Sequence, residues 1–204
     1  MAYKGSSGEL FEKEGLKEQK IIRCQLERGG IMEIKTFDIS YLQKTKNVLI
    51  SAFFREGSNE VFNEWEFAET VLKSDAYLPE LCVIALDGES VIGYNALTKA
   101  EIGDQSGLAL GPLGVQKEYQ NTGVGSALVK ECIRRAAKLG YPWIVLLGGN
   151  YYSRFGFESG KPYGITVSDN AFDNDHVQIM FLDEFAKNKT SGKLVYCDAF
   201  YDSD

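Results

Sequence analysis

The sequence is poor in the residues that build metal centres and disulfide frameworks. It contains one histidine, His176, and four cysteines, Cys24, Cys82, Cys132 and Cys197, which lie far apart and form no C-x-x-C pair. Zinc sites and disulfide-stapled folds need closely spaced sets of such residues. We therefore expect no metal ion and four reduced thiols, and the role of His176 stays open at this point.

Long hydrophobic runs are also absent. The longest tight apolar run, residues 143–147, has the length of a strand, whereas a membrane-spanning helix needs about 20 apolar residues. The first 20 residues mix Lys, Glu and Gly and contain no apolar block of the kind found in a signal peptide. These absences favour a cytoplasmic protein without a membrane partner.

A surplus of positive charge is missing as well. The net charge of −7 at pH 7 disfavours nonspecific binding to nucleic acid. The chain of 204 residues, with 44% hydrophobic and 25% charged content, is otherwise typical of a globular protein and long enough for one core. Residues 1–31 are rich in Lys, Glu and Gly with only isolated apolar pairs, so they predict a flexible tail or upstream extension. Residues 32–204 predict a single domain.

The hydrophobic pattern of residues 32–204 alternates between strand and helix periods. The Asp87-Gly88 pair predicts a tight hairpin between strands 81–86 and 90–98. Residues 122–139 carry an apolar stripe opposite a charged one, which predicts an amphipathic helix ending at Gly140. The apolar strand 143–147 is typical of buried parallel strands, so a strand-helix-strand unit is expected over 108–147. The other expected elements are a strand at 32–37, helices at 41–54 and 63–73, a strand at 108–115, a short helix near Tyr151 and two weaker strands.

The sharpest local feature is the run Q-N-T-G-V-G at residues 120–125, between a predicted strand and the amphipathic helix. Unpaired amides and the dipole at a helix start favour an anion, and glycines let a phosphate approach the backbone. The run lacks the Lys-Ser/Thr ending of a P-loop and the third glycine of a dinucleotide fingerprint, because Leu128 stands there. Taken alone, a glycine pair at a helix start is more often simple turn and packing chemistry.

Pro112 lies inside the predicted strand 108–115. Proline removes a hydrogen-bond donor from a ladder and is tolerated only at edges, bulges or places where strands part. Its position predicts a split in the sheet next to the glycine-rich run. That split favours anion binding over a simple turn.

Residues 108–157 resemble the cofactor-binding core of the GNAT superfamily of acetyl-CoA-dependent N-acyltransferases. The run LGPLGVQKEYQNTGVGSALVKECIRRAAKLGY is similar to its bacterial YhbS-like subgroup, as are GNYYSRFGF at 149–157 and Y-x-x-A-F at 196–200. The likeness extends from about residue 32 to residue 200, and its first third matches only in pattern. It implies an α/β (α+β) fold with a central mixed, mostly antiparallel sheet, flanked by helices, whose fourth and fifth strands splay apart.

The resemblance implies a transferase that moves the acetyl group of acetyl-CoA, a co-substrate, to a primary amine of an unidentified small molecule or peptide. The amine would attack directly in a ternary complex, and a homodimer stays open. In the family the pantetheine arm pairs with the backbone of the fourth strand as if it were an added strand. The positions that would hold the cofactor are Leu113, Gly114, Val115, Gln120, Asn121, Thr122, Gly123, Val124, Gly125, Ser126, Asn150 and Tyr152.

For the chemical step, the resemblance implies two catalytic groups. Tyr152 stands four residues before Gly156, where the family's tyrosine occurs, and its phenol can protonate the departing thiolate. The N–H of Leu113, or that of Gly114, would face the carbonyl oxygen. Tyr151 is then a packing neighbour. The base is undecided between a chain of water molecules and the acids Glu101, Asp104 and Glu66.

Other interpretations use the same residues. A non-catalytic acyl-CoA-binding sensor or partner-binding module would share the cofactor site and lack turnover. An ATP- or NAD-binding protein would need the glycine and lysine signatures that are missing here. The helix side chains Arg134, Arg135 and Lys138 either attract a terminal phosphate or, as is usual on such a face, are simply solvated.

Overall fold

The structure, a computed structural model, describes residues 22–25, 30–54, 64–167 and 174–201. Most of the expected N-terminal tail and the first residue of the helix expected at 63–73 lie outside these ranges. Within the described residues, no helix is both long enough and apolar enough to cross a membrane.

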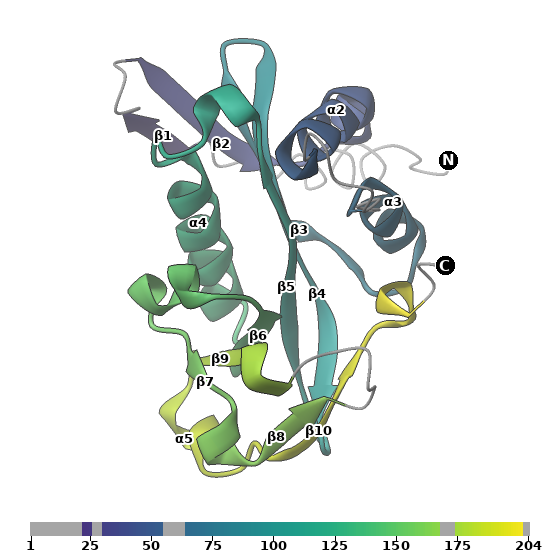
Figure 1. The fold of residues 1–204 in the computed structure, drawn as a ribbon, viewed down its shortest axis with the longest axis vertical. Coiled ribbons are helices and arrows are strands. Elements are labelled where there is room, and N and C mark those ends of the chain that lie inside the picture. Colours follow the sequence, from purple (N-terminus) through teal and green to yellow (C-terminus); the bar gives the residue numbers. More distant parts are fainter. Residues whose placement is uncertain (1–21, 26–29, 55–63, 168–173, 202–204) are drawn as a thin grey trace, which may run out of the picture.

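A ten-stranded sheet forms the centre of the fold (Figure 1). Its strands are β1 (Ile22–Gln25), β2 (Ile31–Thr36), β3 (Tyr77–Asp87), β4 (Ser90–Ile102), β5 (Gln105–Val115), β6 (Trp143–Leu147), β7 (Glu158–Ser159), β8 (Ile165–Val167), β9 (Val177–Phe181) and β10 (Gly192–Tyr196). The spatial order is β1-β2-β3-β4-β5-β6-β9-β7, and β10 pairs with both β4 and β8. Only β5 with β6 and β8 with β10 are parallel. The sheet is thus mixed and mostly antiparallel, which confirms the expected fold class.

Helices cover both faces of this sheet. The α-helices are α2 (Leu42–Phe53), α3 (Glu64–Lys73), α4 (Val124–Lys138) and α5 (Glu184–Lys187), and the 3-10 helices are η1 (Ile39–Tyr41), η2 (Lys117–Tyr119), η3 (Asn150–Phe155), η4 (Lys161–Tyr163), η5 (Asn174–His176) and η6 (Asp198–Phe200). In Figure 1, α4 lies on one side of β3, β4 and β5, whereas α2 and α3 lie on the other. Each side has its own buried apolar cluster.

Helix α4 forms where the sequence predicts it. Leu128, Val129 and Cys132 are fully buried on one stripe of the helix, and this stripe belongs to the largest apolar cluster. The helix ends at Gly140, which has φ 81°. Its N–H donates to Ala137, and the next N–H, that of Tyr141, donates to Ala136. This double hydrogen bond is a Schellman cap.

The N-terminal region differs from a plain tail. Residues 22–25 form strand β1, which pairs antiparallel with β2 in the register Cys24 to Met32. Ile22 and Cys24 pack against the main apolar cluster. One part of the expected tail therefore extends the sheet by a strand.

The hairpin at Asp87-Gly88 also forms, and Gly88 has the expected positive φ of 56°. Its strands are longer than the sequence predicts, because β3 begins at Tyr77 and β4 continues to Ile102. In the added part of β4, the buried Ala100 and Ile102 alternate with exposed residues. That alternation is the pattern of a strand with one covered face.

Candidate functional site

The sheet opens between β5 and β6. These parallel strands pair only at Leu108 with Ile144 and at Ala109 with Val145. Beyond Ala109, β5 continues to Val115 and pairs only with β4 on its other edge. The second half of β5 therefore has an edge that no strand among the described residues covers.

Pro112 lies where the opening begins. The register between β4 and β5 shifts between Asn95 and Leu97, so that Ala96 stands opposite both Gly111 and Pro112. Two residues of one strand opposing one of the other make a β-bulge. Pro112 therefore fits a bulge at the point where the strands part, as the sequence predicts.

The register also decides which backbone groups face the opening. Hydrogen-bonded and non-hydrogen-bonded pairs alternate along antiparallel strands. Gln116 N donates to Ile92 O over 3.0 Å, so Gly114 and its partner Tyr94 form the next hydrogen-bonded pair. Leu113 and Val115 then turn their N–H and C=O groups away from β4. Two N–H groups were expected to face the carbonyl oxygen of the thioester. That of Leu113 points into the opening, and that of Gly114 points to β4.

Gly114 has a different function in the packing. A Cβ atom at this position would lie 2.7 Å from Leu49 Cδ2 and 3.4 Å from Ala52 Cβ. The missing side chain thus lets α2 approach the sheet closely at the opening.

The glycine-rich run forms the entrance to α4. Gly123 is the N-cap residue with φ 91°, and no side chain caps the helix. Asn121 also has a positive φ, 59°, and Thr122 is buried, with its hydroxyl donating to Tyr119 O over 2.6 Å. Because the first amides of a helix have no intrahelical acceptor, the start of α4 presents free donors.

A cavity of about 430 Å³ joins this helix start to the open edge of β5. It brings together seven of the expected cofactor positions, Leu113, Val115, Gln120, Asn121, Gly123, Gly125 and Ser126. Five other expected positions, Gly114, Thr122, Val124, Asn150 and Tyr152, are not among its lining residues. The cavity is also lined by residues that the sequence did not single out for it, namely Ala52, Phe53, Tyr119, Tyr151 and Arg154.

The two tyrosines of η3 occupy different surroundings. Tyr151 is 37% exposed, lines the cavity, and its hydroxyl lies 3.2 Å from Ser126 Oγ. Tyr152 is half-buried and packs against the main cluster, with its ring 5.1 Å from that of Tyr151 and 6.0 Å from that of Phe157. Tyr151 is therefore a wall of the cavity and more than the packing neighbour we expected.

Tyr152 nevertheless has the protonation state that an acid requires. Burial, followed by the proximity of Tyr151, raises the pKa of Tyr152 to about 12. Within the part of the chain that the structure describes, its hydroxyl makes no hydrogen bond. Tyr152 thus carries its proton at neutral pH and has not committed it to a protein acceptor.

Two basic side chains of α4, those of Arg134 and Arg135, bind to other groups of the protein. Glu131 is buried and accepts hydrogen bonds from Arg134 over 2.7 and 2.8 Å and from Arg135 over 2.6 Å. Arg135 also donates to Thr36 and to Glu80 O. Burial would raise the pKa of Glu131, but the two arginines outweigh it and lower that pKa. These arginines are therefore engaged in an internal network, and neither lines the 430 Å³ cavity.

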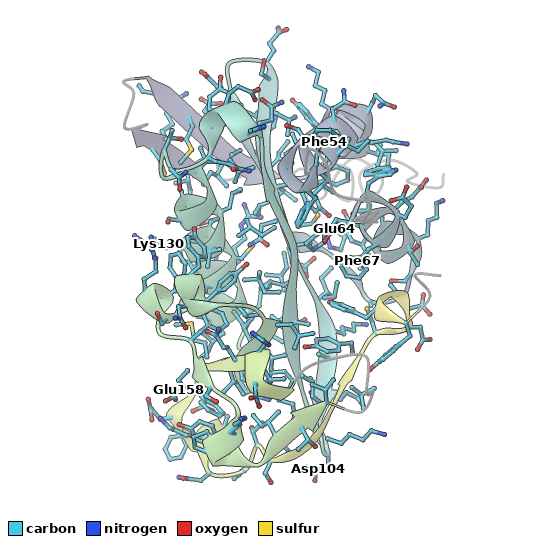
Figure 2. The ribbon with its side chains drawn as sticks, in the orientation of Figure 1. Phe54, Glu64, Phe67, Asp104, Lys130 and Glu158 are labelled. Atoms are coloured by element: carbon cyan, nitrogen blue, oxygen red, sulfur yellow. The ribbon has the colours of Figure 1, made fainter. Side chains whose placement is uncertain are left out.

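None of the acids expected as base candidates reaches the cavity. Figure 2 shows Asp104 at one end of the sheet and Phe54, just after α2, near the other. Glu101 lies close to Asp104 in the same β4–β5 hairpin, and Glu66 is exposed on α3. All three lie apart from the opening in β5.

The cysteines are unpaired, and Cys82 and Cys132 are buried. Burial raises the pKa of Cys82 to about 12, so this group is a thiol at neutral pH and a poor nucleophile. Among residues 22–25, 30–54, 64–167 and 174–201, no group of three or more His, Cys, Asp or Glu could hold a metal ion. His176 is exposed on η5 and its carbonyl accepts from Gly148 N.

Comparison with known proteins points to one family. Residues 79–159 match the family described as acetyltransferase (GNAT) domain. The curated uncharacterized N-acetyltransferase YjhQ of Escherichia coli is 30% identical over 100 residues, which cover 47% of this chain and 55% of that protein. The match thus spans about half the length of that relative.

Two solved structures share the fold over most of their length. The GNAT family N-acetyltransferase YhbS of Escherichia coli, in complex with CoA, has a TM-score of 0.75 at 22% identity, covering 92% of this chain and 97% of that one. A GNAT family acetyltransferase of Brucella melitensis, in complex with acetyl-CoA, has a TM-score of 0.67 at 23% identity, covering 83% and 97%. This chain therefore shares its overall fold with these two structures.

Proposed function

We propose that this chain, whose residues 79–159 match the acetyltransferase (GNAT) domain family, moves the acetyl group of acetyl-CoA to a primary amine of a small molecule or peptide. The observation that carries the proposal is the uncovered edge of β5 beside the uncapped start of α4. A strand edge suits an extended amide-bearing arm, and a helix start suits a diphosphate. Both borders line one cavity.

The chain's own residues fit this co-substrate. The N–H and C=O groups of Leu113 and Val115 would pair with the amides of the pantetheine arm. The amides at Gly123 and Gly125 would hold the diphosphate. At Gly123 a Cβ would meet no atom within 4 Å, so the missing side chain leaves room for the ligand, whereas at Gly125 it makes room for the Tyr151 hydroxyl, which would lie 3.2 Å from a Cβ. The volume of about 430 Å³ is within the ordinary range of small-molecule sites.

For the chemical step, we assign Leu113 and Tyr152 separate roles. The amine nitrogen attacks the thioester carbonyl carbon, and the N–H of Leu113 stabilises the negative charge that develops on the oxygen. When the carbon–sulfur bond breaks, Tyr152, whose ring lies 5.1 Å from that of the cavity residue Tyr151, donates its proton to the departing thiolate. The proton lost by the amine passes to water, because Glu66, Glu101 and Asp104 lie apart from the opening in β5.

Two measurements test the proposal in sequence. Thermal unfolding with acetyl-CoA, ATP or NAD tests binding: a ligand at 100 times its Kd stabilises a protein by about 2.7 kcal/mol, and only acetyl-CoA should do so. Release of free thiol from acetyl-CoA across a panel of amines then tests turnover. Binding without thiol release for any amine would favour the non-catalytic sensor, and stabilisation by ATP or NAD alone would contradict the proposal.

A further inference from the structure

Arg154 stands out among the residues of the cavity because of its charge. Among the described residues that line the cavity, it is the one with a charged side chain. The remaining lining residues are apolar, aromatic or uncharged polar. A ligand that carries negative charge into this cavity would therefore meet a single cation there.

Arg154 is also available for a ligand. Within the described residues it forms no ion pair, whereas Arg134 and Arg135 are bound to Glu131. Its guanidinium instead lies over the ring of Tyr151, with Cζ 4.8 Å from the ring centroid. Stacking on an aromatic face holds the guanidinium in place and leaves its N–H donors unused.

Tyr151 connects Arg154 to the helix start. Its hydroxyl lies 3.2 Å from Ser126 Oγ, and a Cβ added at Gly125 would lie 3.2 Å from that hydroxyl. The ring of Tyr151 thus reaches from the first turn of α4 to η3, where Arg154 lies on it. An anion at the start of α4 would meet the helix amides, and the guanidinium of Arg154 lines the same cavity.

We infer that Arg154, held on the ring of Tyr151, binds the diphosphate of the co-substrate opposite the amides of α4. This inference rests on the proposed function. Charge-assisted hydrogen bonds from a planar guanidinium are among the strongest contacts to phosphate. The contact adds the positive charge that the helix start alone supplies only in part. It also explains how a chain of net charge −7 attracts an anionic ligand to this cavity.

The test compares Arg154→Ala with Lys193→Ala, which removes the same charge from an exposed residue of β10, a strand that contributes no lining residue to the cavity. Calorimetric titration should give Arg154→Ala an about tenfold higher Kd for acetyl-CoA, the about 1.4 kcal/mol expected of one such contact. Arg154→Lys should recover part of the affinity, since it keeps the charge and loses the planar fork. Lys193→Ala should bind as the unchanged protein does.

Two truncated ligands locate the phosphate that Arg154 holds. Acetyl-dephospho-CoA keeps the diphosphate and lacks the terminal phosphate. Arg154→Ala should therefore raise the Kd for acetyl-dephospho-CoA by the same factor as the Kd for acetyl-CoA. S-acetylpantetheine has neither, so its inhibition constant against acetyl-CoA should not change in Arg154→Ala. Full affinity of Arg154→Ala for acetyl-dephospho-CoA would assign Arg154 to the terminal phosphate and overturn the inference. Equal loss with S-acetylpantetheine would make Arg154 a structural wall and overturn it too.

The unchanged protein separates this inference from the proposed function. If it binds acetyl-CoA and Arg154→Ala binds equally well, the inference fails while the proposed function stands. If the unchanged protein does not bind acetyl-CoA, the proposed function itself fails.

Discussion

Replacing Gly123 by alanine tests whether the start of α4 holds a phosphate group. Gly123 caps the helix with φ 91°, a conformation that costs an L-residue about 1–2 kcal/mol. A Cβ there would meet no atom within 4 Å, so the protein should tolerate the variant apart from this strain. The added methyl group would stand at the cavity wall, where a phosphate must approach the amides.

Gly140, at the other end of the same helix, provides the matched control. It has φ 81° and also has no atom within 4 Å of a built Cβ. Gly140→Ala therefore introduces similar strain without touching the cavity. Both variants should lower the Tm, by about 2–8 °C for a chain of this length.

The two variants should differ in ligand binding. We expect Gly123→Ala to raise the Kd for acetyl-CoA at least tenfold, because its methyl group separates the phosphate from donors that act only over hydrogen-bond distance. Gly140→Ala should keep the Kd of the unchanged protein. Titration calorimetry on folded samples measures both. Equal Kd values for the two variants would refute phosphate binding at the start of α4.

Three further outcomes are expected. Tyr152→Phe should lower kcat about 100-fold, at the low end for general acid catalysis, and leave the Kd for acetyl-CoA unchanged, whereas Tyr151→Phe should affect kcat much less. Glu131→Gln should lower the free energy of unfolding by about 3 kcal/mol, since it breaks a buried ion pair. In the unchanged protein, stability is lost as the pH falls through the lowered pKa of Glu131, and the variant should not show this loss. The raised pKa of Cys82 should make stability fall from pH 9 to about 12, because the unfolded thiol ionises first, and Cys82→Ala should flatten that fall.

Each of these outcomes has a contrary result. A kcat for Tyr152→Phe that equals that of the unchanged protein would remove Tyr152 from the acid role, and a large loss in Tyr151→Phe alone would move the role to Tyr151. Urea unfolding at pH 3 to 7 measures the Glu131 contribution, which is absent if Glu131→Gln follows the unchanged protein throughout. An alkaline stability curve that Cys82→Ala does not alter would assign the fall to other groups, such as Tyr77.

Most of the fold could be predicted from local patterns. Helix α4 and the hairpin at Asp87 have signals within a few residues of each other, an amphipathic stripe and a turn dipeptide, so no tertiary information was needed. The end of β4 was harder, because Lys99 and Glu101 look like loop residues until their neighbours are seen to face a covered side of the sheet. Strand β1 could not be predicted, since four residues acquire strand character only by pairing with β2.

The site divides in the same way. Pro112 and Gly123 carry backbone chemistry that the sequence reveals directly, a missing hydrogen-bond donor and a missing side chain where a phosphate could approach. Phe53 and Arg154 line the cavity because of the way α2 and η3 pack around the opening. No local sequence pattern contains that packing. The alternation of hydrogen bonds along β5, which separates Leu113 from Gly114, likewise depends on register. One sequence signal was present for Arg154, a cation beside paired aromatic residues, but it has this meaning only once the ring of Tyr151 is located.

The uncovered edge of β5 has a consequence for the protein's solubility. Exposed strand edges invite other chains to add to a sheet and so promote aggregation. Here the uncovered edge borders the cavity. The β5–β6 pairing ends the opening on one side, and side chains of α2 and η3 line it. A strand added from another chain would have to place its side chains in the cavity that residues of α2 and η3 line, whereas an unbranched molecule carries no side chains. The backbone groups of this edge thereby stay available to a ligand and are harder to reach for another protein molecule.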